Sequence, residues 1–200
     1  MKPPALALDV GGTKLAAGLV DSAGRVLRVA RRRTPPGAVW DAMAAALDEA
    51  RDGQAVRGVG IGCAGPLDPD AGTVSPVNIA GWTQFPLVAE VAAVVPGVPV
   101  VLAGDGVCMA LGEQRHGAGR GHDHLLGVVV STGVGGGLIA SGRPVYGRTG
   151  NAGHVGHVVV EPDGDPCSCG GRGCLETVAA GPRLVRWASA RGCRAGDGAA

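Results

Sequence analysis

Three cysteines crowd the segment PCSCGGRGCLE, which spans residues 166–176. They are Cys167, Cys169 and Cys174, and nine residues separate His157 from the first of them, including the turn-forming stretch PDGDP. Zinc takes four tetrahedral nitrogen and sulfur ligands, and thiols lose their protons on binding it. Residue types and spacing therefore predict a structural Cys3His zinc site, with free thiols in a glycine-rich loop as the alternative.

The other cysteines of the chain have no such partners nearby in the sequence. Cys63 and Cys108 lie in apolar segments, and we predict that they are buried packing residues. Cys193 lies in the sequence RGCRAGDGAA, which has the composition of an unstructured tail, so we predict a tail thiol there.

A glycine turn follows the first apolar run of the chain. In LDVGGTK, Asp9 precedes Gly11, Gly12 and Thr13, whose backbone amides can approach phosphate oxygens without bulky side chains in the way. Asp9 can hold Mg²⁺ through water, and Lys14 can offset phosphate charge. Ordinary hairpin chemistry is the alternative, and the spacing fits neither the P-loop nor the dinucleotide-binding fingerprint.

A second turn of the same kind occurs in STGVGGGL, with Thr132 and Gly133 followed by the glycines 135–137. It also lies between two apolar runs. Two such turns in one chain favour a nucleotide as the ligand over coincidence.

The elements that must position these residues alternate between strand and helix patterns. Residues 5–33 predict three strands, and helical spacing of apolar residues follows from Val39 to a stop at Gly53. A buried strand at 98–102 precedes a helix at about 107–115. This order predicts an α/β fold.

A linker-like composition marks the middle of the chain. The sequence GAGRGHDH at 117–124 separates the helix from the second strand, turn and strand pattern. We therefore predict two domains: residues 1–118 with the first phosphate turn, and residues 119–200 with the second turn and the zinc loop.

Composition excludes several classes of function. The formal net charge is +1 and aromatic residues make up 2% of the chain, so there is no overall field and no stacking platform for nucleic acid. No signal peptide pattern or membrane-spanning apolar run is present, so we expect a cytoplasmic protein that binds neither nucleic acid nor a membrane. The one basic cluster, residues 31–33, is interpreted as a solvated strand end, with a phosphate-binding patch as the alternative.

The segments LDVGGTK, STGVGGG and GHVVVEPDGDPCSCGGRGCLE together resemble the ROK family of sugar kinases and repressors, over about residues 5–184. The resemblance implies an actin-like ATPase (ribonuclease H-like) fold, with a first domain and a second domain that carries the zinc loop. No helix-turn-helix pattern precedes LALDVGG, so the resemblance is to the kinase branch. Family kinases continue well beyond the segment ETVAAGPRLVRWASA, so the resemblance implies that the second domain is incomplete in this chain.

The resemblance assigns roles to individual residues. It implies that Asp105 is the catalytic base, because a sugar hydroxyl must lose its proton as it attacks the terminal phosphate. A helix N-cap is the alternative role for that residue. It also implies a set of residues that contact the sugar, and a zinc ion that holds the loop carrying His157 and Glu176. A solvated charge at a helix end is the alternative role for Glu176. The sugar contacts are Gly65, Asn78, Asp105, His154, His157 and Glu176.

Two positions depart from the family pattern. Family kinases usually have Asn before the catalytic Asp, where this chain has Gly104, and Glu where it has His154. One lost hydrogen bond is worth about 0.5–1.5 kcal/mol, enough to change sugar affinity or choice without abolishing phosphoryl transfer.

The expected function is ATP-dependent phosphorylation of a hexose with Mg²⁺, glucose being the default sugar and N-acetylmannosamine a second candidate. The alternative is a catalytically impaired, zinc-containing protein that binds sugar or a partner. A sugar-responsive regulator ranks last because no DNA-binding segment is evident. The phosphoryl donor, ATP or polyphosphate, stays open, and a homodimer is expected from the resemblance.

Overall fold

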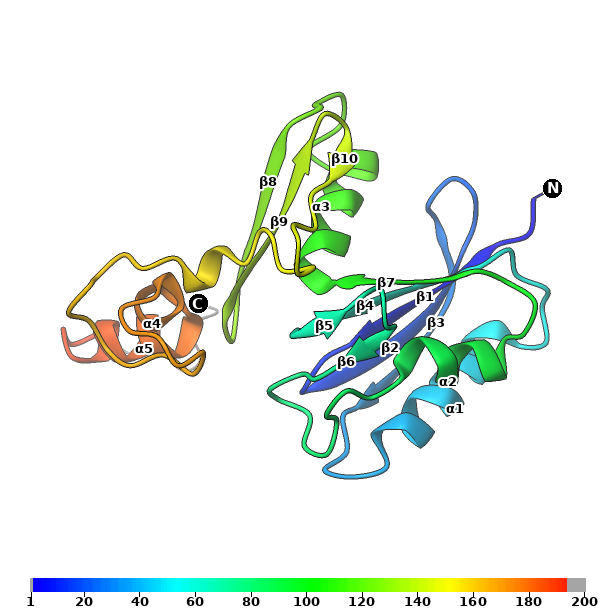
Figure 1. Ribbon diagram of the computed structural model, residues 1–200, viewed down its shortest axis with the longest axis horizontal. Helices are drawn as coiled ribbons and strands as arrows, with labels where there is room; N and C mark the ends of the chain where they lie inside the picture. The colour runs from blue at the N-terminus through cyan, green and yellow to red at the C-terminus, as the bar shows by residue number, and fades with distance from the viewer. Residues whose placement is uncertain (1, 194–200) are drawn as a thin grey trace. The chain divides into compact units, whose positions relative to one another are not determined.

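The computed structural model describes residues 2–193. Its chain divides into two compact units, shown as a ribbon in Figure 1. Unit 1 comprises the described residues of Met1–Cys108 together with Gly147–Asn151, and unit 2 comprises those of Met109–Tyr146 and Ala152–Ala200. Among the described residues, no helix is long and apolar enough to cross a membrane.

Unit 1 is built on a five-stranded mixed sheet with the strand order β3-β2-β1-β4-β7. Strands β1, β2 and β3 form an antiparallel meander, whereas β4 and β7 are parallel to β1. The strands are β1 (Ala5–Val10), β2 (Lys14–Val20), β3 (Val26–Arg33), β4 (Val59–Cys63) and β7 (Val100–Gly104). A small hairpin of β5 (Leu67–Asp68) and β6 (Thr73–Val74) follows β4.

One face of this sheet carries the hydrophobic core. In β1, Leu6, Leu8 and Val10 are buried while Ala7 and Asp9 are exposed, as the period of a strand requires. Helices α1 (Val39–Arg51) and α2 (Leu87–Val94) cover the buried face, as Figure 1 shows, and bury Met43, Leu47 and Val91 against it.

Helix α3 (Asp105–His116) follows β7 without a loop. It begins two residues earlier than the helical spacing predicts, so Asp105 is its first residue. The division between the units falls inside this helix, after Cys108, and our domain boundary at residue 118 stays a prediction.

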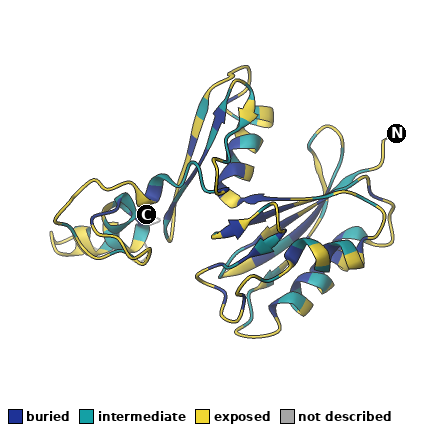
Figure 2. Ribbon diagram, viewed as in Figure 1, coloured by how far each residue is buried: buried dark blue, intermediate teal, exposed yellow. Residues whose placement is uncertain are grey.

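Unit 2 contains a three-stranded antiparallel sheet and short helical pieces around the cysteine loop. Its strands are β8 (Leu125–Val130), β9 (Val134–Ala140) and β10 (Arg143–Pro144), in the order β10-β9-β8. The 3-10 helix η1 (Val155–His157) precedes the loop, and α4 (Leu175–Ala179) and α5 (Gly181–Ser189) follow it. Few large side chains are buried here, and much of β8 is exposed (Figure 2).

Candidate active site and metal centre

The first glycine turn joins β1 to β2 and is closed by a hydrogen bond from the Gly11 backbone N–H to the Lys14 carbonyl, at 3.1 Å. The end of β3 supports the turn: the Thr34 hydroxyl donates to the Gly11 carbonyl at 2.6 Å, and the Thr34 N–H donates to the Thr13 carbonyl at 3.1 Å. Thr34 was not singled out by the sequence, because its partners are remote along the chain.

Gly12 has to be a glycine for a steric reason. A Cβ added there would lie 2.6 Å from the Asn78 Cβ, closer than real Cβ contacts come. The structure thus brings Asn78, which we predict to contact the sugar, directly against the phosphate turn within unit 1.

Asp9 and Lys14 form an exposed ion pair beside this turn, with 3.7 Å between Lys14 Nζ and Asp9 Oδ2. Both side chains are more than half exposed, at 55% for Asp9 and 57% for Lys14. Because water screens such an exposed pair, it adds little to stability, and both charged groups remain available to a ligand.

The carboxyl ends of three parallel strands of unit 1 meet at one edge of the sheet. In the register, Asp9 of β1 pairs with Gly62 of β4, which pairs with Ala103 of β7. The phosphate turn, Gly65 and Asp105 follow these strands and therefore share that edge, which is where open α/β sheets bind ligands. Asp105 is exposed, and one of its carboxylate oxygens accepts the Gly106 N–H at 2.7 Å.

The isolated cysteines differ in exposure. Cys63 is buried as predicted; burial first, then the Asp105 and Asp9 carboxylates, raises its pKa to about 12. Its thiol stays protonated and serves packing. Cys108 is exposed, so the prediction of a buried residue is wrong there: the buried positions in the first turns of α3 are Gly106, Val107 and Ala110, and Cys108 lies outside that buried side of the helix. Cys193 is also exposed.

The second glycine turn joins β8 to β9 in unit 2 and contains Thr132 and Gly133. It is closed by the Ser131 N–H, which donates to the Gly133 carbonyl at 2.8 Å. Glu176 reaches this turn, and its Oε2 accepts the Val134 N–H at 2.8 Å. A Cβ at Gly133 would meet the same carboxylate oxygen. The sequence did not indicate this contact, which links residues 42 positions apart.

His154 precedes η1 and His157 is its last residue, and the His157 N–H donates to the His154 carbonyl at 3.1 Å. Their ring centroids are 6.4 Å apart and the ring planes are inclined by 17°. Both imidazoles therefore come from one short segment of unit 2.

The four predicted metal ligands converge in unit 2. The candidate ligand atoms of His157, Cys167, Cys169 and Cys174 all lie within 4.8 Å of one another. Cys169 Sγ and Cys174 Sγ are 3.7 Å apart, and Cys167 Sγ and His157 Nδ1 are 3.6 Å apart. A tetrahedral zinc ion with ordinary bond lengths separates two sulfurs by about 3.8 Å, and sulfur from nitrogen by about 3.6 Å. The donor set fits zinc in chemistry and in spacing.

The thiols of this cluster differ in acidity. The Cys169 backbone N–H, helped by the side chains of Cys169 and His157, lowers the pKa of Cys167 to about 7. Burial and the neighbouring sulfurs raise the pKa of Cys174 to about 12. Near neutral pH, Cys167 is therefore more ready than Cys174 to act as a ligand.

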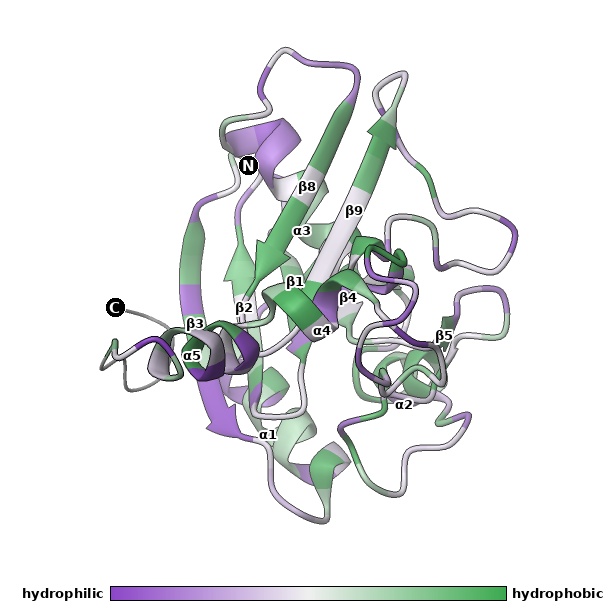
Figure 3. Ribbon diagram, turned by 90° about the vertical axis from the view of Figure 1, so that its left-hand side faces the viewer, coloured by the Kyte–Doolittle hydropathy of each residue, from purple (hydrophilic) through white to green (hydrophobic). Residues whose placement is uncertain are grey.

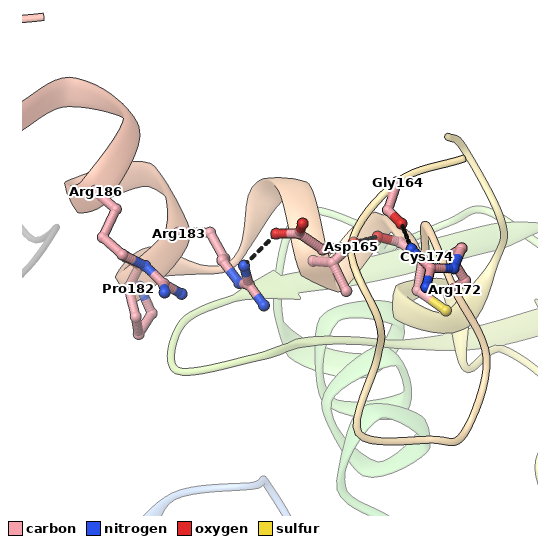
Figure 4. A network of polar contacts seen from close by, with 8 residues as sticks. Gly164, Asp165, Arg172, Cys174, Pro182, Arg183 and Arg186 are labelled. Carbon is pink, nitrogen blue, oxygen red and sulfur yellow. Dashed lines mark hydrogen bonds and ion pairs between the residues drawn. The ribbon is translucent and has the colours of Figure 1, made fainter. Parts of the chain in front are cut away.

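Polar contacts hold the cysteine loop in shape (Figure 4). Arg172 donates to the Gly164 carbonyl at 2.7 Å, across the base of the loop. Arg183 of α5 pairs with Asp165 at 2.6 Å. These contacts join segments before, within and after the ligand set, so the loop is fixed by more than its metal ligands.

Comparison with known proteins identifies the class to which this site belongs. The ROK family model matches residues 5–197, and the chain belongs to the ROK family. Its fold is therefore the actin-like ATPase fold of that family, as the sequence predicts.

Two curated relatives and one solved structure are representative. Glucokinase from Streptomyces coelicolor is 41% identical over 188 residues, covering 93% of this chain and 59% of the relative. N-acetylmannosamine kinase from Yersinia pseudotuberculosis is 38% identical, covering 90% of this chain and 62% of the relative. The crystal structure of a ROK family glucokinase from Streptomyces griseus in complex with glucose and AMPPNP superposes with a TM-score of 0.83 at 44% identity, covering 94% of this chain and 61% of that chain. The chain thus spans about 60% of the length of the proteins it matches.

Proposed function

We propose that this protein transfers a phosphoryl group from ATP to a hydroxyl of a hexose, with glucose the first candidate. The observation that carries the proposal is the shared sheet edge of unit 1, where a glycine turn and Asp105 follow parallel strands. Relatives named as glucokinases support it.

Asp105 acts as the general base in the proposed reaction. The exposed carboxylate takes the proton of the attacking hydroxyl as the new oxygen–phosphorus bond forms and the bond to the leaving nucleoside diphosphate breaks. Because Asp105 begins a helix directly after a core strand, its backbone is held by both elements, which gives the base a fixed position.

Phosphate-binding roles are proposed for each glycine turn by itself: for Gly11, Gly12, Thr13 and Lys14 in unit 1, and for Thr132 and Gly133 in unit 2. Asp9 would hold Mg²⁺ through water, and the ion would supply charge neutralisation of the phosphates when bound. Lys14 adds a further positive charge.

Sugar-binding roles are proposed for Gly65, Asn78 and Asp105 in unit 1, and for His154, His157 and Glu176 in unit 2. We propose zinc as the ion of the Cys3His cluster, held by Cys167, Cys169, Cys174 and His157, where it fixes the loop between His157 and Glu176. Its role is structural, since four protein ligands fill a tetrahedral site and leave no open position for water or substrate.

Gly104 and His154 are proposed to set the choice of sugar. A Cβ at Gly104 would lie 3.8 Å from Leu67 Cδ2, an ordinary contact, so a Cβ fits there without a clash. Gly104→Asn should therefore fold normally and lower the KM for glucose by about 2–10-fold through one added hydrogen bond. A KM that is unchanged for every sugar in Gly104→Asn would contradict the proposed role of Gly104 in the choice of sugar.

The proposal is tested by ADP production from the purified chain with ATP, Mg²⁺ and a panel of hexoses that includes N-acetylmannosamine. Asp105→Asn should lower turnover by about 10²–10⁴-fold, the usual contribution of a general base. Asp41→Asn is the matched control, because Asp41 is an exposed carboxylate in the first turn of α1. Activity that survives Asp105→Asn contradicts the assignment of the base.

A folded, zinc-loaded chain that turns over no sugar with ATP would favour the other candidate, a catalytically impaired protein that binds sugar. Isothermal titration with the same sugars would then detect binding without turnover. The homodimer and the cytoplasmic location stay predictions, which sedimentation and cell fractionation test.

A further inference from the structure

Aromatic residues are rare in this chain, and most of them gather at one place in unit 1. The sequence has three Trp, one Phe and one Tyr. The rings of Trp82 and Phe85 stack, with their centroids 4.1 Å apart and their planes inclined by 8°. The ring of Trp40, in α1, lies 6.3 Å from that of Phe85, centroid to centroid. These three residues are called the aromatic cluster, and all of them belong to the hydrophobic core or pack against it.

The aromatic cluster anchors the loop that carries Asn78. This loop, residues 75–86, joins β6 to α2 and contains no helix or strand. Val74 and Phe85 exchange two backbone hydrogen bonds, of 3.0 and 2.9 Å, which close the loop at its base. Trp82, in the second half of the loop, stacks on Phe85 and is only 8% exposed. The stack therefore ties the loop to its own base.

The far end of the loop is fixed by α2, which is largely hydrophobic in Figure 3. Its residues Leu87 and Val91 are fully buried. Asn78 itself is exposed, so burial of its own side chain does not set its position. The position of Asn78 therefore depends on anchors elsewhere in the loop.

Asn78 meets the phosphate turn at Gly12. A Cβ at Gly12 would lie 2.6 Å from both the Cβ and the side-chain nitrogen of Asn78. The turn has its own anchor in Thr34, which bonds to Gly11 and Thr13. Two separately anchored segments thus meet at Gly12 and Asn78, and a site of this kind is only as precise as the packing that holds each segment.

We propose that Trp82 and Phe85, backed by Trp40, are positioning residues for the hexose, because their stack holds Asn78 in place against the phosphate turn. The inference rests on the proposed role of Asn78 as a sugar contact. Stacked aromatic rings attract each other beyond the effect of their buried area. Phe85 contacts both other rings, so a change there loosens the whole aromatic cluster.

Hexose kinetics test the inference. Phe85→Leu keeps an apolar side chain but removes the stack, so the KM for the hexose should rise by about 2–10-fold, the range of one weakened hydrogen bond. The KM for ATP should stay within about twofold, because Thr34 holds the phosphate turn independently. Phe85→Tyr retains the ring and should retain the KM for the hexose. Should Phe85→Leu fail to fold, Trp40→Leu loosens the same cluster from α1.

A double variant shows whether Phe85 acts through Asn78. In an Asn78→Ala background, Phe85→Leu should change the KM for the hexose by less than about twofold, because the contact that Phe85 positions is already gone. Effects of the two substitutions that multiply would overturn the inference.

Val98→Ala is the matched control for a general loss of packing. Val98 packs against the same hydrophobic core and precedes β7, whereas Asp105 follows the other end of that strand. The KM for either substrate should stay within about twofold in this variant, with urea unfolding used to compare the loss of stability. A KM for the hexose that rises as much in Val98→Ala as in Phe85→Leu would overturn the inference.

Failure of the inference and failure of the proposed function give different results. An NMR measurement needs no substrate: the nuclear Overhauser contact between the Asn78 side-chain amide and the Gly12 α protons should be present in the unaltered chain and lost in Phe85→Leu. Its loss in Phe85→Leu, in a chain that turns over no hexose, keeps the positioning of Asn78 and removes the kinase. Turnover with an unchanged KM for the hexose and an intact contact in Phe85→Leu keeps the kinase and overturns the inference.

Discussion

Unit 1 and unit 2 bury apolar surface to very different extents. The hydrophobic core cluster lies wholly in unit 1, with side chains such as Met43 and Leu47 fully buried. Of the large side chains of unit 2, Val134 and Ile139 are buried, whereas Val128 and Trp187 are 48% and 58% exposed. A small unit with little core needs another source of order. In unit 2, we propose that the Cys3His cluster with its metal bound, together with the polar contacts around it, fills that role.

Removal of the metal should give the largest difference in response between the two units. Chelation of the proposed zinc should abolish amide protection in residues 157–176 and leave that of β1 and β4 unchanged. Binding of structural zinc is worth on the order of 10 kcal/mol, far more than the few apolar contacts of the loop. Hydrogen exchange with mass spectrometry measures both regions in one sample.

Matched cysteine variants check that result. Cys174→Ser should lose the metal, whereas Cys193→Ser, outside the cluster and exposed, should keep it. Loss of protection in unit 1 on chelation would contradict the division of stabilising forces between the units.

A truncation in the core should show the opposite pattern. Leu47→Ala removes a fully buried side chain of α1 and should lower the free energy of unfolding of unit 1 by about 2–5 kcal/mol, with the metal content unchanged. Val128→Ala, on the exposed part of β8, should change the free energy of unfolding of unit 2 by less than about 0.5 kcal/mol. Urea unfolding provides both values, and equal effects would show that unit 2 has a core of its own.

The two glycine turns differ in what an added methyl group would contact. Gly12→Ala places a methyl group against the Asn78 Cβ and should cost about 1–3 kcal/mol, because that atom is held close to the backbone. Gly133→Ala meets only the tip of Glu176, which can swing away, so we expect a cost of about 1 kcal/mol, the value of one hydrogen bond.

Gly135→Ala is the control for both glycine variants, since an added Cβ there meets nothing within 4 Å. Differential scanning calorimetry compares the three melting temperatures. A Gly133→Ala variant less stable than Gly12→Ala would reverse the expected order.

The smallest expected effect is a difference in thiol reactivity inside the cluster. The lowered pKa of Cys167, about 7, means that its thiolate predominates above that pH, whereas the raised pKa of Cys174, about 12, keeps that thiol protonated. In the fraction of metal-free protein that keeps the loop folded, alkylation of Cys167 should therefore rise to half its maximum near pH 7, and the difference between the two thiols should disappear once the loop unfolds. Peptide mapping after a pH series of iodoacetamide labelling measures each cysteine separately. Faster labelling of Cys174 at neutral pH would contradict this order.

The sequence predicted much of the candidate site because its signals are local. Cys167, Cys169 and Cys174 lie within one loop, so their spacing alone limits which ions they can bind. The same holds for the glycine turn after Asp9, whose residues are contiguous. The α/β class followed from apolar periodicity, which a short window of sequence carries.

The contacts that the sequence did not predict join distant segments. Thr34 supports the first turn from the end of β3, Asn78 packs against Gly12, and Glu176 accepts a hydrogen bond from the second turn. Each depends on strand pairing or loop packing that the whole core sets, so no local pattern reveals it.

The run of three arginines shows which properties follow from the sequence and which follow from the tertiary structure. The sequence by itself determined that Arg31, Arg32 and Arg33 form a basic cluster at a strand end. Only the tertiary structure decided that Arg32 pairs with Glu49 of α1 while Arg31 and Arg33 lie with Lys14 on the open face. The reason is physical: strand register and the packing of one helix choose the face, and a shift of one residue would exchange the two sets.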